Sequence, residues 1–291
     1  MTGLKKSAAV FLIAAAATTL IWRNAMDDTP VTPRAPMQVG MQLLEPVASL
    51  LARNNVPSFV ATVDDPETGD SGRFLPVARA NADAVDDPSS ITLTYAAPDC
   101  PLTLPAGRQM QISFEGPVVD SAYLIYPMEP MDWDEMQLMV AQTTDIFARA
   151  GWTVKPQPRF GPPTKILHSI TSAQLNKKTY GTKTVRTGVW HPCDTPFVEA
   201  IAEVRHLNSA PSGVSIPPAG ASAPQNHDAA DRFVMRVSFN IDQDTLSQEI
   251  KTLRDARRFE VKGTIEVPIA MRHWVETPDW RPENWQGRWI K

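Results

Sequence analysis

The sequence contains none of the short motifs that mark the commonest catalytic and nucleotide-binding sites. It has no HExxH, GxSxG, GxxxxGK[ST] or GxGxxG pattern, the signatures of zinc proteases, serine hydrolases, P-loops and dinucleotide sites. Its five histidines do not fall at metal-ligand spacing. We therefore predict no catalytic residues, no bound metal and no cofactor, and nothing in the motifs indicates an enzyme.

An excess of positive charge is absent as well. The chain has 28 basic and 32 acidic residues, for a formal net charge of −4. Because electrostatic binding to nucleic acid requires a basic face, we expect no nucleic-acid partner. Proline is abundant instead, with 27 of 291 residues against a usual share of about 5%, which is typical of a loop-rich chain.

The main apolar run lies at the N-terminus. Residues 1–6, with Lys5 and Lys6, are predicted to be a cytoplasmic leader, and residues 7–22 an uncharged signal anchor that crosses the bacterial inner membrane once. A helix of that length reaches about 24 Å, short of a ~30 Å hydrocarbon layer, and snorkelling lysines make up the difference. The bulk of the chain is then periplasmic; the alternative is cleavage and release into the periplasm.

Cysteine is scarce, with only Cys100 and Cys193. In an oxidising exported compartment the two are predicted to form one disulfide. The alternative makes Cys193 a nucleophile beside His191 and Asp194, but residues adjacent in sequence rarely reach triad geometry. No cysteine lies directly after the apolar run, where a lipoprotein anchor requires one, so we exclude such an anchor.

Composition divides the remaining chain into three kinds of segment. Residues 23–37 are a proline-rich linker, residues 38–291 a periplasmic domain, and residues 208–231 within it a flexible insertion rich in Ala, Ser, Pro and Gly. An acidic stretch at residues 64–72 is followed by Asp83, Asp86 and Asp87. Their spacing does not match a calcium loop, so we predict a solvated loop instead.

Alternating apolar residues predict a set of strands. Residues 196–207 suit a helix (Phe197, Ile201, Val204) or a strand (Val198, Ala200, Ala202), and we favour the strand. The predicted strands lie at residues 91–97, at residues 110–126 (two strands around residues 115–117), and at residues 182–190, 196–207, 233–241 and 261–271, the last from Val261, Ile265, Val267, Ile269 and Met271.

Two long helices complete the pattern. The first begins at Asp132, which forms a capping box with Glu135, and ends at Gly151; its methionines, with Met128 and Met131, are expected to pack on the sheet, with an adaptable binding surface as the alternative. The second is predicted to be capped by Asp244, with Leu246, Ile250, Leu253 and Arg257 on one face. A short helix is also predicted earlier in the chain, ending at Asn54. We predict an α+β layered domain of mostly antiparallel sheet with two main helices, after a single N-terminal membrane-anchor helix.

The C-terminal residues 274–291 carry four of the eight tryptophans. Tryptophan and arginine are enriched at interface hot spots, which makes Trp280, Trp285, Trp289 and Arg288 candidate partner-binding residues. We favour the alternative that this tail wraps its own domain; contact with lipid headgroups is a third possibility.

The stretch "ISFEGPVVDSAYLIYPMEPMDWDEMQLMVAQTTDIFARAGW" resembles a pattern in small membrane-anchored envelope proteins of proteobacteria, in which a strand pair leads into a helix ending in "AGW". Several of these resemble immunity or accessory proteins of the type VI secretion system. The resemblance implies a membrane-tethered periplasmic binding protein without catalysis, whose partner is a protein, in the sharpest version a toxin that this immunity protein neutralises. The alternatives are a structural or accessory component of an envelope or secretion assembly, and a periplasmic hydrolase.

Overall fold

The computed structural model describes residues 37–54, 69–74, 90–155, 184–192, 197–207, 232–241, 243–288 and 290. Among these residues no helix is both long and apolar enough to span a bilayer. The segment 1–22, most of the linker, Asp83, Asp86, Asp87, Cys193, the insertion 208–231 and Trp289 lie outside the described residues, and the expectations for them stay predictions.

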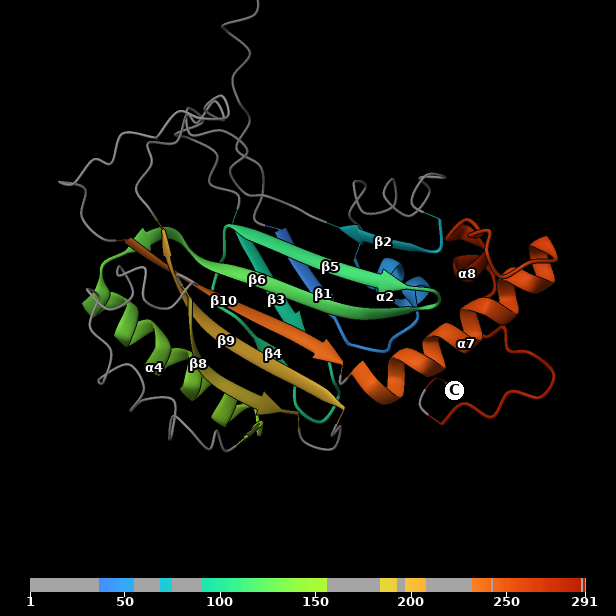
Figure 1. The fold of residues 1–291 in the computed structure, drawn as a ribbon. Helices are drawn as coiled ribbons and strands as arrows, with labels where there is room; N and C mark the ends of the chain where they lie inside the picture. The colour runs from blue at the N-terminus through green and yellow to red at the C-terminus, as the bar shows by residue number, and fades with distance from the viewer. Residues whose placement is uncertain are drawn as a thin grey trace, which may run out of the picture. The chain divides into compact units, whose positions relative to one another are not determined.

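Seven strands form the larger of two sheets (Figure 1). Every neighbouring pair in it is antiparallel. Its order is β2 (Ser71–Phe74), β5 (Gln109–Glu115), β6 (Val118–Met131), β10 (Arg232–Ile241), β9 (Val198–Leu207), β8 (Thr184–His191) and β7 (Thr153–Val154). The strand that we favoured at residues 196–207 is confirmed by β9.

A smaller sheet contains β1 (Met37–Met41), β3 (Ile91–Tyr95) and β4 (Leu102–Thr103). In it β1 pairs with β3 in parallel and β4 with β3 antiparallel. The sequence did not reveal β1, whose first residue, Met37, was assigned to the linker. The mostly antiparallel α+β architecture is confirmed.

Helix α4 (Trp133–Arg149) forms where the capping box predicts it. The Glu135 amide donates to Asp132 Oδ1 at 2.9 Å, and the Asp132 amide donates to Glu135 Oε2 at 3.2 Å. Gly151, at φ 78°, supplies the left-handed residue at which the chain leaves the helix. Met136, Val140, Thr143 and Phe147 are buried along one stripe, and Met139 packs against the core, so the methionines of this helix pack on the sheet as predicted. Met128 and Met131 belong to β6, a strand of that sheet, and are partly buried against the core.

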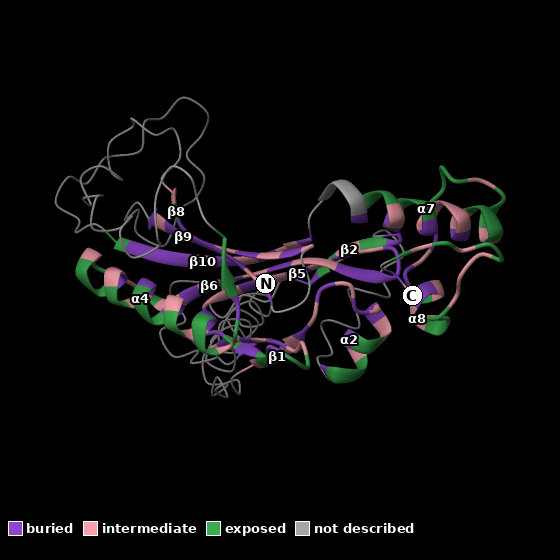
Figure 2. Ribbon diagram, turned by 90° about the horizontal axis from the view of Figure 1, so that it is seen from below, coloured by how far each residue is buried: buried purple, intermediate pink, exposed green. Residues whose placement is uncertain are grey.

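The core lies between the two sheets and under α4. Figure 2 shows α4, β1 and α2 (Val47–Arg53) on the same side of the seven-stranded sheet. Aromatic rings join these layers: Tyr95 of the small sheet stacks on Phe239 of β10 at 5.3 Å, and Phe147 of α4 stacks on Trp190 of β8 at 4.3 Å. One face of the large sheet is therefore committed to the core.

The C-terminal part contains α7 (Gln243–Lys262) and the short α8 (Arg272–Glu276). The predicted buried face of α7 is confirmed, since Leu246, Ile250, Leu253 and Arg257 are all buried. The predicted cap is wrong by position: the helix begins at Gln243, so Asp244 lies in its first turn.

The strand predicted from Val261 to Met271 is wrong. Val261 belongs to α7, which ends at Lys262 and is followed by Gly263 at φ 71°, and the residues after it pair with no strand among the described residues. Ile265 and Val267 are nearly half exposed, whereas Ile269 and Met271 are buried. Only the second half of the alternating set therefore packs on the core, and it does so as irregular chain.

Candidate functional site

The face of the seven-stranded sheet opposite α4 carries polar and half-buried side chains. Side chains alternate along each strand, so that in β10 Val237 and Phe239 enter the core while Ser238 and Asn240 point the other way. We call this surface the outer face; its central residues are Gln109, Gln111, Tyr123, Glu203, Arg205, Arg236 and Ser238.

Contacts between strands hold the outer face in place. The Arg236 guanidinium lies 4.0 Å above the Tyr123 ring, and Gln109 Nε2 donates to the Tyr123 hydroxyl at 3.1 Å. Within β9, the next strand, Arg205 pairs with Glu203 at 3.4 Å. Burial, and then the nearby Arg205, lower the pKa of Arg236. The outer face therefore presents ordered aromatic and charged groups.

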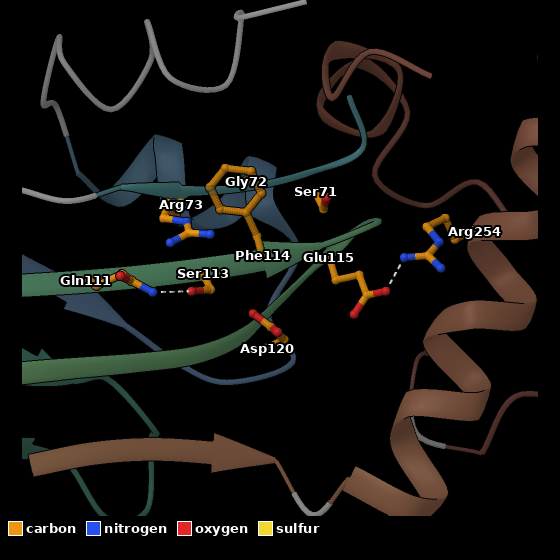
Figure 3. Close-up of a pocket in the computed structure, with 9 residues that line it drawn as sticks. All are labelled: Ser71, Gly72, Arg73, Gln111, Ser113, Phe114, Glu115, Asp120 and Arg254. Carbon is orange, nitrogen blue, oxygen red and sulfur yellow. Dashed lines mark hydrogen bonds and ion pairs between the residues drawn. The ribbon is translucent and has the colours of Figure 1, made fainter. Parts of the chain in front are cut away.

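A pocket of about 510 Å³ lies where the outer face meets α7 (Figure 3). Its lining is mostly polar and includes two arginines and two carboxylates. The lining residues are Ser71, Gly72, Arg73, Gln111, Ser113, Phe114, Glu115, Asp120 and Arg254.

Two local features of the chain bring these residues together. Antiparallel pairing of β2 with β5 sets Ser71 opposite Glu115 and Arg73 opposite Ser113. The tight turn after β5 uses Gly116 at φ 55° and returns the chain so that Asp120 follows on β6. Glu115 and Asp120 thus face one pocket from the two arms of a hairpin.

Helix α7 closes the pocket from a distant part of the chain. Its Arg254 forms an ion pair with Glu115, 139 residues away in sequence. One turn later, Arg258 donates from Nε and Nη2 to the two carboxylate oxygens of Asp70 at 2.7 and 2.6 Å. Asp70 is only 1% exposed, so the solvated loop predicted for residues 64–72 is wrong at this residue. The pair anchors the start of β2 to α7.

Asp120 is the electrostatically unusual residue of the pocket. Its Oδ1 is shielded from solvent and has no hydrogen-bond partner among the described residues. Burial first, and then the neighbouring Glu115 carboxylate, raise the pKa of Asp120; hydrogen bonds from the Asp120 and Ser121 amides and the Ser121 side chain partly offset this. Among the described residues, the only ion pair of this carboxylate pair is the one that Arg254 makes with Glu115.

The pocket is suited to binding a charged group. Its lining contains no histidine, and the Ser113 hydroxyl accepts a hydrogen bond from Gln111 Nε2 at 2.9 Å. No group of three potential metal ligands occurs among the described residues. Sequence reasoning did not identify the pocket, because β2, the β5–β6 hairpin and α7 are separate segments of the chain, and Arg254 lies 139 residues from Glu115.

The tryptophans predicted to contact a partner lie partly against the domain itself. Trp280 packs edge-on against the buried Trp274 at 5.9 Å, and Arg257 lies 4.6 Å above its ring. Trp285 Nε1 donates to the Ile290 carbonyl at 2.8 Å. Both indoles remain half-buried and Arg288 is exposed. Partner binding by the tail stays a prediction.

Cys100 is buried beside the segment that leads to Cys193. The Cys100 carbonyl accepts from Trp152 Nε1 at 3.2 Å, and the following residue, Thr153, pairs with His191, two positions before Cys193. The disulfide itself stays a prediction.

Comparison of the chain with protein-family models, with curated proteins and with solved structures found no significant match.

Proposed function

We propose that this chain is an exported, membrane-tethered, non-catalytic binding protein whose α+β domain docks a partner protein on the outer face of its seven-stranded sheet. Its most specific form comes from the resemblance described above: the partner is a toxin, and the chain is the immunity protein that neutralises it. The apolar segment 7–22 and the lysines before it support the tether.

The pre-ordered outer face is the observation that carries this proposal. Tyrosine and arginine are the residue types that contribute most to protein interfaces. Tyr123 is already held by Gln109 from one side and Arg236 from above. Because such side chains lose little freedom when a partner docks, more of the contact energy remains as affinity.

Site-specific photocrosslinking in the bacterium that produces the chain tests the proposal. A photoreactive amino acid replaces Ser238 at the centre of the outer face. The matched control replaces Leu138, which is 66% exposed on α4, on the opposite side of the sheet. We expect one discrete adduct from position 238, absent from position 138, with a protein that then co-purifies in a 1:1 complex.

Equal labelling from both positions, or no adduct from position 238, contradicts the proposal. Adducts that join many copies of this chain to one another favour the alternative of a structural envelope component.

A further inference from the structure

The pocket beside the outer face has a carboxylate, Asp120, that forms no ion pair with any residue in the described part of the chain. Glu115 and Asp120 face the same space, and Arg254 reaches only Glu115 (Figure 3). Arg73 is exposed to solvent on β2 and forms no ion pair with Asp120. Water screens the charge of Arg73 far more than that of the half-buried Asp120. A positive group that enters the pocket therefore meets an unbalanced negative charge.

We infer that this pocket receives the basic side chain, arginine or lysine, of the partner protein, with Asp120 as the carboxylate that binds it. The inference rests on the proposed function, because it names the chemistry that the partner presents at one end of the outer face. A cation there stabilises both carboxylates at once, since it offsets the repulsion between Glu115 and Asp120. The net charge of the chain, −4, is complementary to a basic partner.

Other ligand classes fit the pocket less well. An anion would be repelled by two carboxylates, and the arginine nearest to them is already paired with Glu115. A metal ion needs more oxygen ligands than this pair supplies, and the described residues contain no group of three potential ligands. A volume of about 510 Å³ lies within the ~300–1,000 Å³ of small-ligand pockets and accommodates a single long side chain.

The test uses the full-length chain, purified in detergent, and capped amino acids as probes. N-acetyl-arginine amide and N-acetyl-lysine amide carry the cation, and N-acetyl-citrulline amide has nearly the shape of the arginine probe without its charge. Ligand-observed saturation-transfer NMR measures each dissociation constant. We expect values on the order of millimolar for both cations, since one side chain supplies little of an interface. The citrulline probe should bind at least about tenfold more weakly.

Three variants locate the binding. Asp120→Asn keeps the shape of the side chain and should weaken the arginine probe at least about tenfold. Asp145→Asn, the same change on the exposed side of α4, should leave the dissociation constant unchanged. Arg73→Gln should leave it unchanged or lower it. N-acetyl-arginine with a free carboxylate serves as a further probe. If it binds more tightly than the capped arginine probe, and this gain disappears in Arg73→Gln, then Arg73 contacts the carboxylate of the bound residue, which is consistent with the inference.

Equal binding of the arginine and citrulline probes, full binding by Asp120→Asn, or no saturable signal overturns the inference. The comparison of the two probes needs only the unmodified chain, so it decides the matter even where a variant fails to fold. Failure of the proposed function has a different outcome. If the arginine probe binds through Asp120 but the photoreactive residue at position 238 captures no partner, the proposed function fails and the pocket takes a free basic ligand. If position 238 captures a partner and the Asp120→Asn variant binds that partner equally well, only the pocket inference fails.

Discussion

The ion pair between Asp70 and Arg258 joins the strand that lines the pocket to helix α7. Asp70 is 1% exposed and the Arg258 side chain is 14% exposed, and two parallel hydrogen bonds connect them. Arg258 also donates from Nη1 to the Ile265 carbonyl at 3.1 Å. Asp70 has no other counter-ion among the described residues, so its buried charge depends on this arginine.

Replacing Arg258 with methionine keeps most of the apolar stem and removes the charge. The Asp70 carboxylate is then left buried and unpaired, a change that typically costs about 3–5 kcal/mol. A typical domain is stable by only about 5–15 kcal/mol, so the loss should be large. Urea unfolding at pH 7, followed by circular dichroism, gives the change in the free energy of unfolding from the shift in midpoint.

Arg254→Met is the matched control, one helical turn away. Its partner Glu115 is 36% exposed and water can solvate it, so this change should cost only about 1 kcal/mol or less. The double variant Asp70→Asn with Arg258→Met should recover part of the loss, because neither charge is then left unpaired. If Arg258→Met costs no more than Arg254→Met, then Asp70 is not held as a buried charge and the reasoning is wrong.

Three further predictions concern the helix cap, the core and the pocket. Asp132→Ala should lower the free energy of unfolding by about 1 kcal/mol, since it removes the capping box of α4; Asp145→Ala in the middle of that helix should not, and equal effects would argue against the cap. Phe147→Ala should cost about 3–5 kcal/mol because its ring is fully buried, while Leu138→Ala on the exposed side should change stability by less than about 0.5 kcal/mol; similar urea midpoints for both would contradict this packing. Burial and Glu115 raise the pKa of Asp120, so its ionised form disfavours the folded state at neutral pH, and that cost disappears as the pH falls through the raised pKa. Asp120→Asn should therefore be more stable than the unmodified chain at pH 7, by an amount that shrinks in acid; a less stable variant at pH 7 would refute the assignment.

The elements that the sequence predicted well are those whose signals are local. The capping box of α4 links residues three apart, and the buried stripe of α7 repeats every three or four residues. Each signal predicts its helix correctly because it depends only on residues that are close together in sequence. The same holds for β10, where alternate residues from Phe233 to Ile241 face the core.

The errors occur where a distant partner decides the outcome. Asp70 looks like a loop residue because acidic residues with glycine and proline around them usually are solvated, and only Arg258, 188 residues later, shows otherwise. The apolar alternation after Gly263 looked like a strand, but Ile265 and Val267 are nearly half exposed, and alternation alone does not show that a strand pairs there. The sequence did not predict the pocket for the same reason, since Glu115 and Arg254 meet only in the folded chain.

The effect of Asp120 on stability and its effect on ligand binding can both be measured in one variant, Asp120→Asn. A half-buried carboxylate beside another carboxylate disfavours the fold, and local violations of this kind are expected where a site must remain ready for a ligand. If Asp120→Asn gains stability and loses affinity for the capped arginine, the two effects have one cause: the charge that the fold leaves unbalanced is the charge that the ligand balances. If the variant gains stability and binds the capped arginine unchanged, the carboxylate destabilises this domain without contributing to binding.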